Sequence, residues 1–172
     1  MVNRDSFVIE DARLMFRNFA GREREFNSAG DRNFCILLEP HMAEQLRHDG
    51  WNVKELKVKE EGETPQAYIQ VTVNYSKGRP PRCVLISSRG RNDLGADEVE
   101  ILDVVDIARA DVSLNPYHWE VRDNKGVKAY LKSIYVTAQE DELDIKYAQV
   151  PEKAGTPTDD PPPWETPGGD DD

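Results

Sequence analysis

Hydrophobic and polar residues alternate along much of this chain, as they do in strands that bury one face against a core. The clearest alternation covers residues 66–75, where Ile69, Val71, Val73 and Tyr75 share one face. Similar strand-like segments occur at 6–19, 33–39, 52–58, 82–88, 98–107, 108–121 and 126–139. The pattern therefore predicts a mainly β protein.

Polar residues interrupt this pattern where the chain is expected to bend or turn. The pair Glu10-Asp11 breaks the alternation of 6–19, and it predicts a bulge or bend within one long strand. The segment 122–126, RDNKG, predicts a hairpin between the last two strands. The glycine-rich segment 89–95 is expected to be a loop.

One short helix is predicted after the second strand. Pro40 suits a first helical position, and Gly50 stands where a helix ends. Between them, Met42, Ala43 and Leu46 form a one-sided apolar stripe. Many strands around one short helix predict an OB-like barrel, closed or partly open, with the helix covering one end. A β-sandwich is the alternative, although it accounts less well for the helix.

Residues 151–172 differ in composition from the rest of the chain. They are rich in proline, glycine and acid, and they carry a net charge of −6 out of −11 for the whole chain. Such a segment buries too little apolar area to offset the entropy of ordering it. We therefore divide the chain into a folded domain at 1–150 and a disordered acidic tail at 151–172.

Basic residues are concentrated where acids are missing. The segment 64–92 contains no Asp or Glu. A second basic segment, 13–24, places arginines beside phenylalanines, and the last strand alternates cations with a tyrosine on one face. Single-strand binding requires this combination, because cations follow the phosphates while rings stack on the bases. The predicted DNA-binding residues are Arg13, Phe16, Arg17, Arg22, Tyr68, Lys77, Arg79, Arg82, Arg89, Arg91, Lys128, Tyr130 and Lys132.

The sequence offers little support for catalysis or for a cofactor. It has no CxxC pair, no metal-like cluster of His and Cys, and no glycine-rich phosphate loop. Cys35 and Cys83 are expected to be buried, reduced thiols, which suits a cytoplasmic protein. Asp103 and Asp106 leave a metal-dependent nuclease open as an alternative, and Trp119 is expected to be buried.

Five segments of the chain resemble phage-encoded single-stranded DNA-binding proteins. They are ARLMFRNFAG, GDRNFCILLE, MAEQLRHDGWNVKELK, QAYIQVTVNY and VKAYLKSIYVT. The resemblance implies an OB-fold that holds the strand, and an acidic disordered tail that recruits replication and recombination proteins. The tail residues that correspond to that role are Trp164, Asp170, Asp171 and Asp172, although the terminal Pro-Phe pair usual in bacterial single-strand binders is missing.

These observations favour a non-enzymatic protein that binds single-stranded DNA, without sequence preference, in phage replication or recombination. We expect it in the cytoplasm of the host cell, with no membrane segment and no cofactor. The tail is expected to compete with DNA for the basic surface. An acidic adaptor or DNA mimic that does not bind DNA is the alternative from another class. The sequence leaves open whether the chain forms a homo-oligomer.

Overall fold

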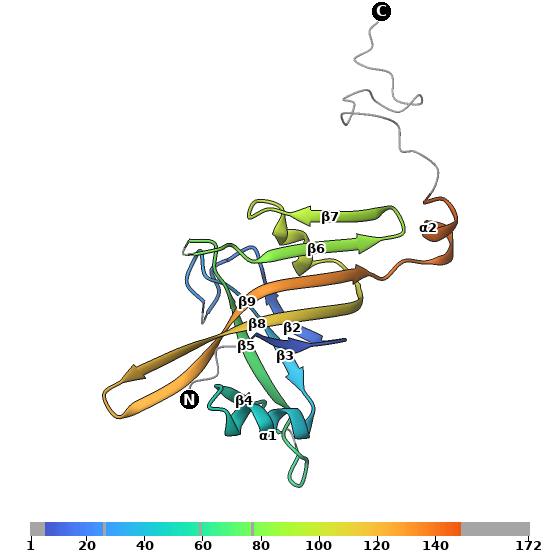
Figure 1. The fold of residues 1–172 in the computed structure, drawn as a ribbon. Helices are drawn as coiled ribbons and strands as arrows, with labels where there is room; N and C mark the ends of the chain where they lie inside the picture. The colour runs from blue at the N-terminus through green and yellow to red at the C-terminus, as the bar shows by residue number, and fades with distance from the viewer. Residues whose placement is uncertain (1–5, 26, 59, 77, 149–172) are drawn as a thin grey trace, which may run out of the picture.

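The computed structural model describes residues 6–25, 27–58, 60–76 and 78–148. Strands dominate it, and the described strands belong to one sheet (Figure 1). The strands are β1 (Phe7–Ile9), β2 (Arg13–Asn18), β3 (Arg32–Leu38), β4 (Val53–Glu55), β5 (Ala67–Val73), β6 (Arg82–Ser87), β7 (Gly90–Leu94), β8 (Ile107–Val121) and β9 (Asn124–Ala138). The helices are α1 (Pro40–His48), the 3₁₀ helix η1 (Val99–Asp103) and α2 (Glu142–Lys146).

The sheet closes on itself because its first strand is bent. The strand order is β1-β8-β9-β5-β3-β2, so the two ends of the path are consecutive in the chain. Between β1 and β2, Asp11 has a φ of 51°, and the Ala12 N–H donates to the Ala110 carbonyl over 2.7 Å. The predicted bend is confirmed. It lets one long strand pair with β8 on one side and with β3 on the other, which makes an OB-like barrel and excludes two separate sheets.

A parallel pair of strands completes the barrel. β5 runs parallel to β9, with Val71 opposite Ala129, whereas β3 pairs with β5 and β8 pairs with β9 in antiparallel fashion. Beyond β5, the second half of β9 pairs with β6, also in parallel. One edge of β9 is therefore covered first by β5 and then by the β6–β7 hairpin.

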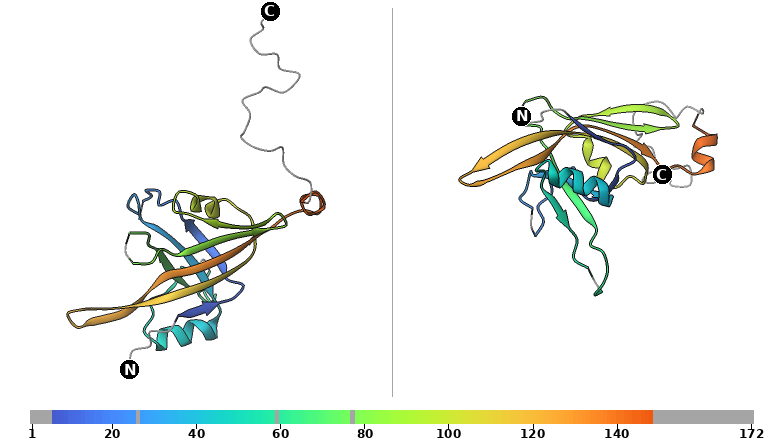
Figure 2. Two further views of the ribbon diagram at one scale, coloured as in Figure 1. Left: turned by 45° about the horizontal axis from the view of Figure 1, so that its top comes forward. Right: turned by 60° about the horizontal axis from the view of Figure 1, so that its bottom comes forward.

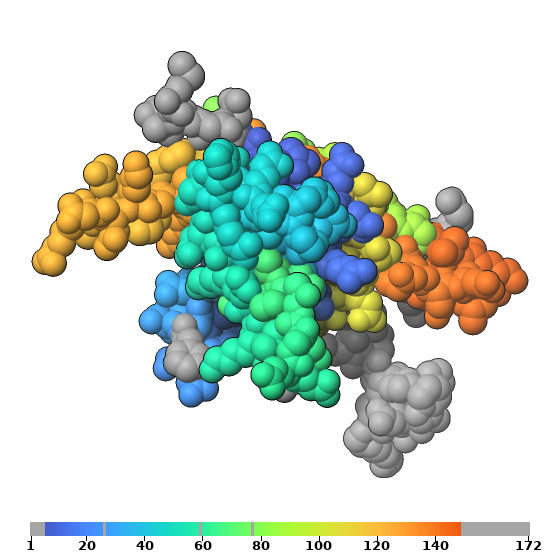
Figure 3. Space-filling model, turned by 90° about the horizontal axis from the view of Figure 1, so that it is seen from below, coloured from blue at the N-terminus to red at the C-terminus, as the bar shows by residue number. Residues whose placement is uncertain are grey.

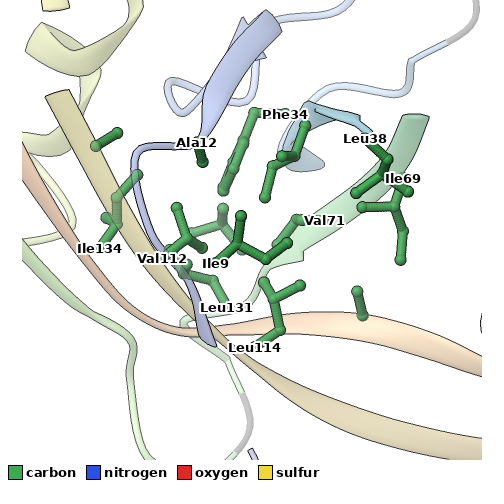
Figure 4. Close-up of a cluster of buried hydrophobic side chains, with 14 of the residues drawn as sticks. Ile9, Ala12, Phe34, Leu38, Ile69, Val71, Val112, Leu114, Leu131 and Ile134 are labelled. Atoms are coloured by element: carbon green, nitrogen blue, oxygen red, sulfur yellow. The ribbon is translucent and has the colours of Figure 1, made fainter. Parts of the chain in front are cut away.

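The core lies inside this barrel and consists of the inward residues of every long strand. In β5 the buried residues alternate as predicted, and Val71 is fully buried. Phe19 and Phe34 stack with ring centroids 4.9 Å apart. Figure 4 shows Val71, Val112 and Leu114, from β5 and β8, converging on the same interior. This burial provides most of the driving force for folding.

Helix α1 covers one end of the barrel, as the apolar stripe predicted. Ala43 and Leu46 are buried, Pro40 stands in the first turn, and Gly50 has a φ of 90° where the chain leaves the helix. Seen from below, α1 lies across the barrel end while the β8–β9 hairpin extends to one side (Figure 3). Among the described residues, no helix is long and apolar enough to cross a membrane.

Two local predictions were wrong, and one short helix was missed. Residues 98–107 contain η1 instead of a continuous strand, because Val99 and Leu102 are buried at a helical spacing of three. Residues 90–94 form β7 and pair with β6, although their exposed side chains show no alternation. The short helix α2 was not predicted; the side chain and N–H groups of Asp141 and Asp144 cap each other at its start.

The β8–β9 hairpin is long enough to leave the barrel. Its turn lies between Val121 and Asn124, as predicted, and its outer part projects from the body (Figures 1 and 2). We call residues 117–128 the arm. The tail at 151–172, with Trp164 and the terminal aspartates, lies outside the described residues.

Candidate nucleic-acid interface

A groove of about 590 Å³ runs over the outer face of the barrel, where β3, β5 and β9 lie side by side. Strand register places its residues in rows, because directly paired residues point to the same face of a sheet. Asn33 of β3 lies opposite Thr72 of β5, and Thr72 lies opposite Tyr130 of β9. We call this surface the outer groove. Its lining includes Asn27, Asn33, Gln70, Thr72, Lys128 and Tyr130.

Exposed cations lie in this groove or on the strands that flank it. The Lys128 Nζ is 5.4 Å from the centroid of the Tyr130 ring. Lys54 of β4 lies opposite Tyr68, and its Nζ is 3.4 Å from the Gln70 Oε1. Arg13 of β2 lies opposite Leu37 on the same outer face. Within the residues that the structure describes, none of these three cations forms an ion pair, so their charge is available to phosphate.

The thiol below Lys54 shows how well the floor of the groove is packed. Cys35 lies opposite Gln70, and burial raises the pKa of its thiol to about 11, while the positive charge of Lys54 acts in the opposite direction. Such a thiol is neutral at physiological pH. The floor of the outer groove beneath Lys54 therefore carries no charge at Cys35.

Aromatic rings are available beside these cations. Tyr68 and Tyr130 are half-buried on the outer face. Tyr117, on the arm, is 54% exposed and meets Tyr130 edge to face, with ring centroids 5.5 Å apart. Rings held at the surface by such contacts lose little entropy when a base stacks on them.

Phe16 is turned outward by an irregularity in β2. The register with β3 shifts between Met15 and Asn18, and Phe16 has a φ of 50° and a side chain that is 60% exposed. A left-handed conformation costs an aromatic residue about 1–2 kcal/mol, and an exposed ring recovers none of this by burial. Such strain is a typical mark of a functional position.

The loop that borders the groove is held in one shape by asparagines. The Asn27 side-chain amide donates to the carbonyls of Arg22 and Asp31, each over 2.9 Å, and accepts from the Asn33 Nδ2 over 2.7 Å. Buried Asn18 donates to the same Arg22 carbonyl over 3.0 Å. The exposed Arg22 side chain therefore projects from a preorganised rim.

Arg17, predicted to bind DNA, and Asp103, considered as a metal ligand, both bind backbone groups that are distant in the sequence. The Arg17 Nη1 donates to the carbonyls of Leu102 and Val105, over 2.9 and 2.7 Å. The Asp103 carboxylate accepts from the backbone N–H groups of Phe19 and Ala20. Asp103 is thus occupied, and among the described residues no group of His, Cys, Asp and Glu could hold a metal ion. The geometry gives the nuclease alternative no support.

The cations of residues 64–92, the segment without Asp or Glu, do not gather in one place. Its first strand, β5, crosses the outer groove, whereas the β6–β7 hairpin carries its arginines along the other half of β9. There Asp93, one residue beyond the segment, lies 3.9 Å from Arg82 and 3.4 Å from Arg91. The Arg91 guanidinium also lies 5.7 Å from the Tyr135 ring.

The remaining predicted residues are distributed around this hairpin and β9. Arg79 and Arg89 are exposed, Lys77 lies outside the described residues, and the Lys132 Nζ donates to the Ser6 Oγ over 3.1 Å. Sequence reasoning missed Lys54 and Tyr117, because their positions depend on strand pairing. It also expected Trp119 to be buried, whereas its side chain is half-exposed on the arm.

One family of known proteins is similar to this chain over most of its length. A family model described as "Putative phage ssDNA-binding domain" matches residues 1–160. None of the curated proteins compared with the sequence matches it.

Solved structures with a similar fold include the single-stranded DNA-binding protein from bacteriophage Enc34 in complex with ssDNA. It matches with a TM-score of 0.53 at 9% identity, over 79% of this chain and 88% of that chain. A C-terminal truncation of the same phage protein matches with a TM-score of 0.51 at 9% identity, over 79% and 87%. This likeness agrees with the OB-like barrel described above.

Proposed function

Because this chain belongs to the phage ssDNA-binding domain family, it is a non-enzymatic protein that binds single-stranded DNA, and we propose that the strand lies in the outer groove. The observation that carries this proposal is the row of unpaired cations and half-exposed rings on one face of β2, β3, β4, β5 and β9. OB-folds bind oligonucleotides on one face of their strands.

The contacts support binding without sequence preference. Lys54 and Lys128 can follow the phosphates, while Tyr68 and Tyr130 offer rings to any base. Stacking contributes about 1–3 kcal/mol per base, and every base has a face that can stack. We include Arg13, Arg22 and Phe16 as contacts at the rim. By binding through this groove, the protein would coat single-stranded DNA during phage replication or recombination in the host cytoplasm.

We assign the other predicted cations lesser roles. Arg17 positions η1 and the segment after it through its two carbonyl contacts. Arg82 and Arg91 share Asp93, so part of their charge is neutralised before DNA arrives. Arg79, Arg89 and Lys132 lie around the second half of β9, where they would add electrostatic attraction.

A ring substitution in the groove tests the proposal. Tyr130→Ala should weaken binding of a labelled oligo-dT by about 5- to 150-fold, which corresponds to the loss of one stacked base. The matched control is Tyr147→Ala, because Tyr147 is also exposed (52%) but follows α2, at the other end of β9. Equal affinities for the Tyr130 variant and the unmodified protein, measured by fluorescence anisotropy, would place the strand elsewhere.

The acidic tail, 151–172, is proposed to compete with DNA and to recruit replication or recombination proteins through Trp164 and the terminal aspartates. Its net charge of −6 opposes the cations of the groove, and a tethered segment acts at high effective concentration. When DNA displaces it, the tail becomes accessible to other proteins.

Removing the tail tests this regulation separately from the groove. A 1–150 truncation should bind oligo-dT more tightly than the full chain at low salt, and the difference should shrink as salt screens the contact. The control is a full-length chain whose tail acids are replaced by Asn and Gln, which keeps the tether length. The competition is disproved if truncation leaves the affinity at low salt unchanged.

A further inference from the structure

The arm carries a second surface that continues the outer groove, and this inference rests on the proposed groove. Register again defines the face. Lys128 lies opposite Tyr117, and Gly126 lies opposite Trp119, so these residues share the outward side with Tyr130. Val121, at the tip of the same side, is 61% exposed. Apolar and aromatic side chains therefore extend along the outward side of the arm, whereas on its other side Val127 is buried against the body.

Trp119 is held in place by the absence of a side chain opposite it. A Cβ at Gly126 would lie 2.8 Å from the Trp119 Cζ2, closer than real contacts allow, and 3.0 Å from its Cε2, which is a tight contact. The backbone of Gly126 does not need a positive φ, so the glycine is explained by the approach of the indole. The ring packs against the backbone of β9 and remains half-exposed.

The charges of the arm suit an anionic ligand on the same side. Lys128 contributes a positive charge to the outward face of the arm, the face that also carries Tyr117 and Trp119. Glu120 lies opposite Lys125 on the other face, and Asp123 lies in the turn. Phosphate would therefore meet a cation and rings on the outward face, without a carboxylate from that face opposing it.

The surface is continuous with the outer groove. The Tyr117 ring contacts the Tyr130 ring edge to face, and Lys128 lies over Tyr130. From Tyr130 to Gly126 the strand advances about 13 Å, given roughly 3.3 Å per residue. A DNA strand that leaves the outer groove along β9 would reach Trp119 after this distance.

We propose that the arm is the second part of the DNA path, with Trp119 on Gly126 as a stacking platform for a base beyond the groove. The platform extends the length of strand that one molecule covers, and short oligonucleotides held by the groove do not use it. The binding of long strands and of short strands should therefore depend on different residues.

The experiment compares Trp119→Leu with Tyr130→Ala in the full chain, using oligo-dT from about 4 to about 20 nucleotides. Trp119→Leu should weaken binding of long oligonucleotides by about 5- to 150-fold and leave the shortest bound ones unaffected. Trp119→Phe, which keeps a ring, should restore most of the loss. Tyr130→Ala should weaken binding at every length, and if it has no effect the groove proposal fails instead.

A second variant, together with thermal unfolding, separates the loss of the indole position from a change in folding. Gly126→Ala should displace the indole and give a smaller, length-dependent loss, while thermal unfolding of all variants is followed in parallel. Equal affinities for long oligonucleotides with and without Trp119, in variants that unfold like the unmodified protein, would overturn the proposal. So would a change in self-association without DNA, measured by sedimentation, because it would assign the arm to contacts between copies.

Discussion

Removing the three unpaired cations of the outer face should change how DNA binding responds to salt. Arg13, Lys54 and Lys128 form no ion pair among the described residues, so each can replace a counterion at a phosphate. For single strands, each such contact contributes about 0.7 to the slope of log affinity against log salt. The variant with Arg13→Gln, Lys54→Gln and Lys128→Gln should therefore have a slope lower by about 2.

This difference is large enough to measure by fluorescence anisotropy. Between about 50 and about 200 mM salt, the unmodified protein should lose about 20-fold more affinity for oligo-dT than the triple variant. Glutamine keeps much of the length and polarity of each side chain, so folding should be little affected. At high salt the two proteins should converge, because the remaining affinity comes from stacking.

Single substitutions distinguish a local contact from the effect of net charge. Lys128→Gln should lower the slope by about 0.7, whereas Lys146→Gln should leave it unchanged. Lys146 is also an exposed lysine, but it lies on α2, at the opposite end of β9 from the arm. Equal slopes for the triple variant and the unmodified protein would refute the placement of the DNA strand in the outer groove. The same conclusion would follow if Lys146→Gln lowered the slope as much as Lys128→Gln.

Three further outcomes are expected from the geometry. In urea titrations, the free energy of unfolding of Phe16→Gly should exceed that of Phe16→Ala by about 1 kcal/mol, because glycine accepts the positive φ. Both variants should bind DNA more weakly than the unmodified protein, and equal stability of the two variants would show that the strain is absent. Asp103→Ala should lower the free energy of unfolding by about 1–3 kcal/mol, because it leaves two N–H groups without their acceptor, whereas exposed Asp106→Ala should not. Burial raises the pKa of the Cys35 thiol from 9.0 to about 11, so its stabilising contribution is present below pH 9.0 and should be lost as the pH rises through about 11; Cys35→Ala should reduce this loss in urea titrations at a series of pH values.

Local patterns predicted those parts of the fold that depend on neighbouring residues. The alternation in β5, the bend at Glu10-Asp11 and the turn of the β8–β9 hairpin all follow from side-chain spacing or turn chemistry. The helix α1 follows from a proline, an apolar stripe and a glycine in sequence order. Where the pattern was weak, as in β7 with its exposed side chains, the prediction was wrong.

Residues of the candidate site were harder to predict, because charge along the chain differs from charge in space. Arg82 and Arg91 belong to a segment without acids, yet a β-turn brings Asp93 between them. Arg17 resembled the other arginines in the sequence, but its hydrogen bonds tie it to carbonyls that are more than eighty residues away. Neither partner could be inferred without knowing which strands pair.

The amino-acid sequence by itself determined the class of protein: a mainly β body with one early helix, basic and aromatic segments, and a segregated acidic tail. Composition and periodicity suffice for this, because burial of alternate residues and solvation of charged ones are local choices. The tertiary structure alone decided which rings and cations meet. Register and barrel closure place Lys54 beside Tyr68, and Lys128 and Tyr117 beside Tyr130. The partners in the pairs Lys54–Tyr68 and Tyr117–Tyr130 come from different strands. A one-residue shift in any of them would turn each side chain to the other face.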